Sequence, residues 1–245
     1  MKKLILSAVI AAAASSANAG EVSLGLTSSY SPAVYKGLDS NVEPFPFIGY
    51  QGDQFYIEGV ELGYHLVHRD APLNLIFRVA YDPRTLKPED SDDADIKLLD
   101  ERKAGALGGV TLQHKGAVGT LQATVGTSLN NTETGYYGEL VWKHHINRGF
   151  YGLIPEIGYA YNSEELNDHL YGVSAEEASR TRFDEFHAGN SGKMFVGLGS
   201  YAYLSKSLRL TLSARYTKLD SEIADSPIVR RDDALSGTFG VSYIF

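Results

Sequence analysis

Two stretches near the end of the chain alternate between apolar and polar side chains. In residues 207–218, every second position from Leu208 to Tyr216 is apolar, and the positions between them carry Arg, Thr or Ser. In residues 234–245, the apolar positions of the same two-residue pattern continue to a final phenylalanine. The apolar positions are Leu208, Leu210, Leu212, Ala214 and Tyr216, then Leu235, Phe239, Val241, Tyr243 and Phe245. Such alternation is typical of a β-strand with one apolar and one polar face, so we expect two antiparallel strands here.

Residues 1–19 have the pattern of a secretory signal. Lys2 and Lys3 precede an apolar run over residues 4–14, and Ala17-Asn18-Ala19 gives the small-x-small cleavage pattern. The alternative, an N-terminal membrane anchor, fits poorly because the run is too short to span a bilayer. We therefore expect a cleaved signal peptide over residues 1–19 and a single domain over residues 20–245.

Composition narrows the class of the exported domain. After residue 19 no run of eighteen apolar residues occurs, which excludes a helical membrane protein. The chain has no cysteine, so disulfides cannot hold it together. Its sixteen tyrosines and ten phenylalanines suit strands and interfacial girdles, and its formal charge of −8 argues against a nucleic-acid partner. These features favour an all-β chain that forms a transmembrane antiparallel β-barrel in the outer membrane of a Gram-negative bacterium.

The same alternation predicts the other strands. They are expected at residues 21–30, 44–50, 73–81, 104–114, 117–129, 134–145, 150–161 and 193–204. Short turns follow at residues 51–53, 69–72, 115–116, 147–149 and 205–206, whereas long loops occupy residues 31–43, 82–102, 162–192 and 219–233. In outer-membrane barrels the short turns are periplasmic and the long loops external. Within the third long loop, Ser174 and Glu177 have capping-box spacing, which predicts a short helix from Ala175 to about Arg182.

Residues 54–68 decide the number of strands. The apolar parity changes near Gly59, and a slip of one residue turns every side chain to the opposite face, so a turn or bulge is required. If the segment forms a hairpin that crosses twice, the loops alternate correctly and the barrel has about twelve strands. If it crosses once, about ten strands result. We favour twelve, although residues 54–58 are short for a crossing.

Several motifs resemble the MltA-interacting protein family, also called the MipA/OmpV family. They are YKGLD at residues 35–39, PFPFIGYQG at residues 44–52 and LDERK at residues 99–103. The strongest matches are Tyr171, Gly172, Val173 and Ser174, then Glu177 and Arg180, and finally Asp225, Ser226 and Pro227. The motifs lie in order across the whole mature chain. His169 stands where a tyrosine pair would be expected, which is a small departure.

The resemblance implies an outer-membrane barrel without an active site. One branch of the family is described as a scaffold that joins a periplasmic lytic transglycosylase to a peptidoglycan synthase, and other members are known as antigens, osmolarity-responsive proteins or adhesion factors. We therefore expect a non-enzymatic envelope protein in contact with outer-membrane lipid, with both murein enzymes as candidate partners. A narrow solute or ion channel is the alternative function, and an outer-membrane hydrolase is a distant third.

Catalytic and metal-binding readings find little in the residues. Ser179, Asp184 and His187 share one loop, but no nucleophile-elbow pattern accompanies them. The acidic run at residues 89–95 lacks the glycine and the distal glutamate of an EF-hand, which favours a solvated loop over a calcium site. His144 and His145 would lie on opposite faces of a strand. We predict no catalytic residue, cofactor or metal.

Charged residues on the polar parity of the strands should face the lumen. They are Glu61, Arg78, Glu139, Lys143, Glu156, Arg209 and Arg215, with His65 beside them. Mixed charges of this kind can line a permeation path, or they can pair with one another in a plug. We favour a plug or a small pore, because the side chains could nearly fill a barrel of this width.

Overall fold

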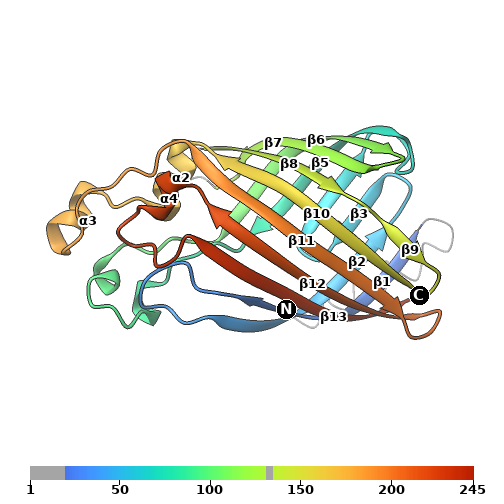
Figure 1. Ribbon diagram of the computed structural model, residues 1–245, viewed down its shortest axis with the longest axis horizontal. Helices are drawn as coiled ribbons and strands as arrows, with labels where there is room; N and C mark the ends of the chain where they lie inside the picture. The colour runs from blue at the N-terminus through green and yellow to red at the C-terminus, as the bar shows by residue number, and fades with distance from the viewer. Residues whose placement is uncertain (1–19, 131–134) are drawn as a thin grey trace, which may run out of the picture.

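The computed structural model describes residues 20–130 and 135–245, which form one closed antiparallel barrel (Figure 1). The strands are β1 (Glu21–Ser31), β2 (Asn41–Gln51), β3 (Phe55–Glu58), β4 (Glu61–His65), β5 (Leu73–Asp82), β6 (Gly105–Gly116), β7 (Gly119–Ser128), β8 (Tyr136–Lys143), β9 (Ile146–Arg148), β10 (Tyr151–Asn162), β11 (Ser191–Tyr203), β12 (Leu208–Leu219) and β13 (Asp233–Ile244). The expected signal peptide over residues 1–19 and the expected start of a strand at Thr134 lie outside the described residues.

The barrel has twelve strand positions. Neighbours along the chain pair around the ring, β13 pairs with β1, and β10 pairs with β11, so the described sheet returns on itself. Both β8 and β9 pair with β10, which makes them two parts of one wall position interrupted at residues 144–145. The expectation of twelve strands rather than ten is confirmed.

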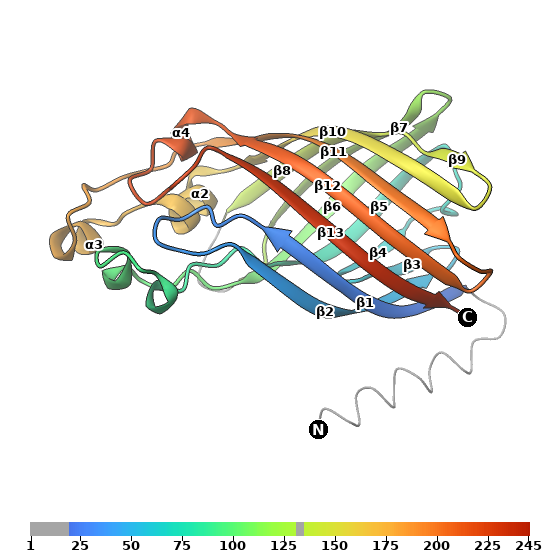
Figure 2. The same ribbon diagram turned by 60° about the horizontal axis from the view of Figure 1, so that its bottom comes forward.

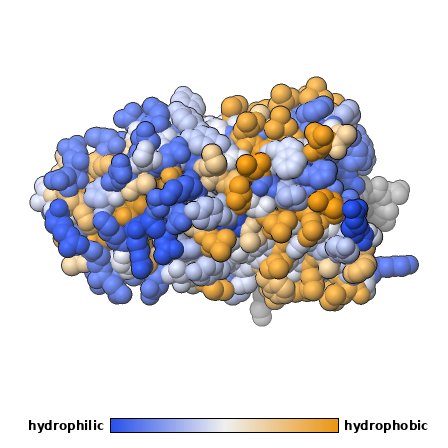
Figure 3. All heavy atoms as spheres, viewed as in Figure 1, coloured by the Kyte–Doolittle hydropathy of each residue, from blue (hydrophilic) through white to orange (hydrophobic). Residues whose placement is uncertain are grey.

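Alternation along each strand sets an apolar outer face and a polar inner face. On β12, Leu212 and Tyr216 are exposed on the outside, whereas Ser213 and Arg215 line the interior. Figure 3 shows apolar residues gathered over the strands and hydrophilic residues gathered over the end of the molecule that carries the long loops. No water is present in the hydrocarbon layer of a membrane to hydrate backbone groups. A sheet can therefore span that layer only if its hydrogen bonds close into a barrel, and an apolar outer face of this kind suits contact with lipid.

Exposed aromatic side chains form two girdles around the outer face. Near the long loops lie Tyr30, Tyr81, Tyr136, Tyr159, Tyr161 and Tyr216. Near the short turns lie Phe55, Tyr64, Phe150, Tyr151, Tyr243 and Phe245. Amphipathic rings gather at both interfaces of a membrane, so the girdles mark the limits of the embedded band.

The ambiguous segment forms a hairpin, as expected, but its two strands do not span the wall. β3 has four residues and β4 has five, and the hairpin turns at Gly59, whose φ of 59° lies in the region that favours glycine. β2 has eleven residues, and only Gly49–Gln51 pair with β3. The expectation of two full crossings is therefore wrong in extent, although the order of the strands is right.

Short and long connections lie at opposite ends of the barrel. Figure 2 shows α2, α3 and α4 gathered at the loop end and the C-terminus at the turn end. The expected helix is present as α3 (Ala175–Arg180), with its capping box formed. Further helices occur at α2 (Glu164–Tyr171), α4 (Ser221–Ala224), η1 (Pro88–Asp90) and η2 (Ile96–Leu98).

None of the helices in the described part of the chain is long and apolar enough to cross a membrane.

A charge on the outer face should destabilise the barrel. Val125 on β7 is 69% exposed between the girdles, whereas Gln122 on the same strand lines the interior. Val125→Arg is expected to lower the free energy of unfolding in lipid vesicles by about 2–4 kcal/mol, as arginine does near the bilayer midplane. Gln122→Arg is the control and should lower it much less. Equal losses in urea titrations would contradict the assignment of the two faces.

Candidate functional site

Four long loops close one end of the barrel, and we call them the cap. They comprise residues 32–40, 83–104, 163–190 and 220–232. Apolar side chains from all four meet in one buried cluster, to which Tyr137 of β8 also belongs: Tyr35, Leu86, Ile96, Leu99, Leu166, Leu170, Tyr171, Val173, Phe183, Ala188, Ile223, Ile228 and Val229. Loops that share a buried core have one packed arrangement, so the cap is a rigid lid on the lumen.

Hydrogen bonds to backbone carbonyls tie the loops of the cap together. The Tyr35 hydroxyl donates to Leu170 O at 2.9 Å, and Lys36 Nζ donates to Pro227 O at 2.6 Å. The Ser226 hydroxyl donates to Tyr171 O at 2.6 Å and joins the last loop to the third. Buried carbonyls need partners, so each of these side chains fixes the position of a neighbouring loop.

A buried ion pair lies within the cap. Arg102 Nη2 is 2.7 Å from Glu177 Oε1, and the two side chains are only 8% and 3% exposed. Burial alone would raise the pKa of the Glu177 carboxyl, but the N–H groups of Ser174 and Asp100 and the Arg102 guanidinium outweigh it, so the pKa lies below its ordinary value. Glu177 is therefore charged at neutral pH and joins the second loop to the third.

Every residue of the strongest motifs lies in the cap. Gly172 O accepts from Arg102 Nη2 at 3.3 Å, Val173 bridges to Phe186, and Arg180 Nη2 is 2.6 Å from Asp100 Oδ1. Asp225 ends α4, and its N–H donates to Ser221 O. Gly172 and Arg180 thus contact the second loop, whereas Val173 and Asp225 make contacts within their own loops. Sequence reasoning missed Arg102 and Tyr35 as their partners, although both stand in quoted motifs.

The acidic run at residues 89–95 is part of the cap. Arg182 Nη2 is 2.8 Å from Asp93 Oδ2, and Arg182 Nε is 3.2 Å from Asp95 Oδ2. Ser91 is buried, and its hydroxyl donates to Lys36 O at 3.3 Å. The expectation of a solvated loop therefore holds for Glu89, Asp90 and Asp92, which are exposed, but not for Asp93 and Asp95, whose carboxylates pair with a guanidinium of another loop.

A small pocket of about 300 Å³ opens beside the ion pair. His169 and Asp168 line it together with Arg102 and Glu177. Burial and the guanidinium groups of Arg102 and Arg84 lower the pKa of His169 to about 4. His169 is thus a neutral imidazole at neutral pH.

Ser179, Asp184 and His187, the candidate hydrolase residues, do not form a common site. The Ser179 hydroxyl donates to Glu176 O, whereas His187 Nδ1 lies 2.8 Å from Asp168 Oδ2. His187 instead belongs to a surface group with Glu164 and Asp168 whose ligand atoms lie within 4.8 Å of one another. Exposed groups of this kind are common without an ion, and the group does not include Ser179 or Asp184.

The lumen contains a cavity of about 770 Å³ in the part of the barrel below the cap. Predicted lumen residues that line it are Glu61, His65, Arg78, Lys143, Glu156 and Arg215. Glu139 and Arg209 share the inward parity of their strands but lie outside this lining. The expectation that side chains would nearly fill the barrel is wrong, because eleven strands contribute to a cavity that remains open between them.

Ion pairs between strands lie along the inner wall of the cavity. Arg215 Nη2 is 2.7 Å from Glu156 Oε1, with Lys143 Nζ 3.9 Å from the other carboxylate oxygen, and Arg78 Nε is 3.8 Å from Glu61 Oε2. The charges are thus mostly paired, as buried charges must be.

The two neighbouring histidines lie on opposite sides of the wall. His144 stacks on the Trp142 ring, with centroids 6.0 Å apart, and His145 lines the cavity. The separation arises at the break between β8 and β9 and not within a regular strand.

Comparison with known proteins decides the family. The family profile described as MltA-interacting protein MipA matches residues 24–245. The chain belongs to the MltA-interacting protein family. It is 32% identical over 247 residues to the MltA-interacting protein of Escherichia coli strain K12, covering 100% of this chain and 99% of that one. It is 30% identical over 230 residues to YiaT of the same strain, covering 94% and 93%. A third relative, the outer membrane protein OmpV of Vibrio cholerae, is 30% identical over 141 residues, covering 57% and 54%.

This member of the family is an outer-membrane β-barrel protein. The names of its relatives give the outer membrane, and the fold gives the closed barrel. The residues given above as the strongest matches, which are residues 171–174, Glu177, Arg180 and residues 225–227, all lie in the cap, whereas the motif at residues 44–52 lies mostly in β2.

Removing one member of the buried pair should loosen the cap. Glu177→Ala leaves the Arg102 guanidinium buried without its carboxylate, a loss that costs about 3–5 kcal/mol in comparable sites. Faster cleavage of residues 83–104 and 163–190 by an added protease is the expected result, with the barrel intact. Glu176→Ala is the matched control, since the neighbouring glutamate is exposed. Unchanged cleavage in Glu177→Ala would refute the role of the pair.

The cap should also weaken in acid. His169 has a pKa of about 4 in the folded cap against about 6.5 when unfolded, so the open cap binds more protons between these values. Stability is therefore present above pH 6.5 and falls as the pH drops toward 4. Hydrogen–deuterium exchange of residues 163–190, corrected for its intrinsic pH dependence, should rise over this range. The rise should be smaller in His169→Gln; the same rise in both proteins would contradict the assignment.

Proposed function

We propose that this protein is a structural and scaffolding component of the outer membrane that offers its periplasmic end to enzymes that remodel peptidoglycan. The observation that carries the proposal is the cap. Four loops around one buried core close the loop end, and a packed lid is unsuited to steady passage of solutes. The candidate catalytic residues Ser179 and His187 do not come together, so we assign the barrel a structural role.

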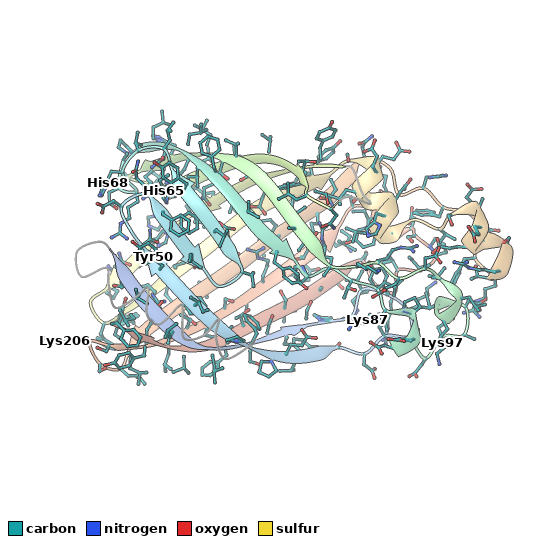
Figure 4. The ribbon with its side chains drawn as sticks, turned by 180° about the vertical axis from the view of Figure 1, so that it is seen from behind. Tyr50, His65, His68, Lys87, Lys97 and Lys206 are labelled. Atoms are coloured by element: carbon teal, nitrogen blue, oxygen red, sulfur yellow. The ribbon has the colours of Figure 1, made fainter. Side chains whose placement is uncertain are left out.

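The turn end is the surface that would face the periplasm. Barrels of this class have short periplasmic turns and long external loops, which puts the cap outside. Figure 4 places His68 and Lys206 at the turn end and Lys87 and Lys97 at the cap end. The turns at this end are short, so a partner would meet a small interface.

The partner class rests on a relative's name. The Escherichia coli protein that is 32% identical over its whole length is called MltA-interacting protein. We carry that interaction to this chain as a proposal, with a periplasmic lytic transglycosylase as the first partner and a peptidoglycan synthase as the second. Exposed apolar side chains at Val118 and Leu204, together with the exposed Lys206, offer the mixed surface that transient docking uses.

A narrow channel is the second candidate, and the cavity favours it. Its lining of Lys143, Glu156, Arg215 and other polar groups resembles the polar interior of a conducting barrel. Conduction would require the cap to open, since its core lies across the loop end.

Capture from solubilised envelopes tests the scaffold. The folded protein is expected to retain a lytic transglycosylase, and Lys206→Glu at the turn end should weaken that capture severalfold by reversing an exposed charge. Lys97→Glu at the cap end is the matched control and should leave capture unchanged. Capture that is lost equally in both variants, or absent from the parent protein, would contradict docking at the turn end.

The same preparation, placed in planar bilayers, separates the second candidate from the first. The scaffold leaves the bilayer without steady conductance. Open-channel currents whose ion selectivity changes in Arg215→Glu would favour the channel instead, because Arg215 lines the cavity.

A further inference from the structure

The barrel wall has an unpaired strand edge beside the short hairpin. β2 runs to Asn41, but its pairing with β3 covers only Gly49–Gln51, followed by one further bond from Gly59 N–H to Ile48 O. No other described strand pairs with that edge of β2, so Val42, Pro44 and Pro46, which have the parity of Ile48, face no partner strand on that side. Figure 4 shows the hairpin ending well short of the cap, while β2 continues toward it.

The unpaired edge lies on the membrane side of the loop-end girdle. Val42 is opposite Tyr30, and Tyr81 N–H donates to Val60 O at the hairpin turn. Tyr30 and Tyr81 both belong to that girdle. The gap between β2 and the hairpin therefore faces hydrocarbon and not the external solvent.

Prolines occupy the edge that has no partner. Because Ile48 O points toward β3, residues of the same parity on β2 point their backbone groups the same way, and two of these are Pro44 and Pro46. Neither has an N–H to leave unpaired, and neither can donate to an added strand. On the far border Tyr81 is the last residue that bonds to the hairpin, and the next of that parity is Pro83. The edge is therefore protected against pairing with another chain.

Aromatic side chains line the gap from within. Phe45 and Phe47 share the inward parity of Gln51, which lines the cavity. The Phe47 ring lies beside the hairpin turn, since a Cβ placed on Gly59 would be 3.6 Å from Phe47 Cδ2. Both rings are half-buried, in an interior that is otherwise largely polar.

The cavity reaches the hairpin turn. Glu58 and Glu61, the residues on either side of the hairpin turn, both line the cavity. Outside the gap, Leu26, Val42 and Val60 are exposed apolar residues, with Leu26 67% exposed opposite Pro46. The carbonyl groups left on the edge require hydration, which the polar cavity behind them can supply. Apolar side chains thus flank the gap on its outer side, and the polar cavity reaches the hairpin turn on its inner side.

We propose that the gap between β2 and the β3–β4 hairpin is a lateral lipid site, at which an acyl chain from the leaflet around the loop end enters the lumen and packs on Phe45 and Phe47. A second protein strand is the less suitable occupant, because Pro44 and Pro46 have no N–H to donate to it. An acyl chain needs no donor, and two aromatic rings offer it a dry surface. The proposal is independent of the scaffold role and survives if no murein enzyme binds.

Quenching by brominated acyl chains tests the site directly. The chain has one tryptophan, so Trp142→Phe gives a silent background in which Phe47→Trp reports on the gap, and Phe45→Trp serves if the first variant fails to fold. The probe is a vesicle of phosphatidylcholine brominated in its acyl chains, compared with unbrominated vesicles. Heat-modifiable migration on gels confirms that each barrel is folded.

Two control positions bracket the expected result. Val125→Trp faces lipid and should be strongly quenched, whereas Phe195→Trp lies inside a fully paired part of the wall at 2% exposure and should be weakly quenched. The indole of Phe47→Trp is expected to be quenched severalfold more than that of Phe195→Trp and to approach Val125→Trp. Quenching no greater than in Phe195→Trp for both gap variants, or quenching by aqueous iodide in place of bromine, would overturn the proposal.

Discussion

The structure depends on one constraint, the need of every backbone amide and carbonyl to find a partner where no water reaches. A sheet in hydrocarbon meets it only by closing, and here β1 meets β13 through a register of eight residue pairs. Closure without a single disulfide is then sufficient to hold the chain, because opening the ring would expose two edges to lipid. The apolar outer face, the girdles and the polar interior all follow from that ring.

Two features of the protein are departures from a plain closed cylinder, and each is stabilised in its own way. At the loop end, four long loops share a packed core, and the buried Arg102–Glu177 pair joins two of these loops. Beside the β3–β4 hairpin, the ladder is incomplete, and prolines replace the donors that would otherwise be orphaned. The proposed scaffold role and the proposed lipid site rest on these two departures and not on the barrel fold as such.

The sequence predicts what short-range periodicity controls. The period of two set the faces of β12, with Leu212 outside and Arg215 inside against Glu156, and the spacing of Ser174 and Glu177 set α3. Periodicity also located the turn at Gly59, because a change of parity is local. The sequence also showed that residues 54–58 are short for a crossing, but it could not predict how far the hairpin pairs with β2, since the length of a strand pair depends on both partners.

Contacts between distant loops escape the same reasoning. Glu177 was recognised as a helix cap, yet its second role, pairing with Arg102, depends on how two loops fold over each other. The acidic residues Asp93 and Asp95 looked solvated because their partner Arg182 lies in another loop. The cavity was missed because side-chain volumes along a strand do not fix how widely the ring opens.

The most direct measurement of the central claim is a spin-label scan along β12 in lipid vesicles. The chain has no native cysteine, so single cysteines at residues 209–216 can carry a nitroxide without background. Accessibility to oxygen, which is enriched in lipid, should peak at Leu210, Leu212, Ala214 and Tyr216, and accessibility to a water-soluble nickel chelate should peak at the intervening positions. Accessibility without a period of two, or with the two parities reversed, would contradict a closed barrel whose apolar face meets the membrane.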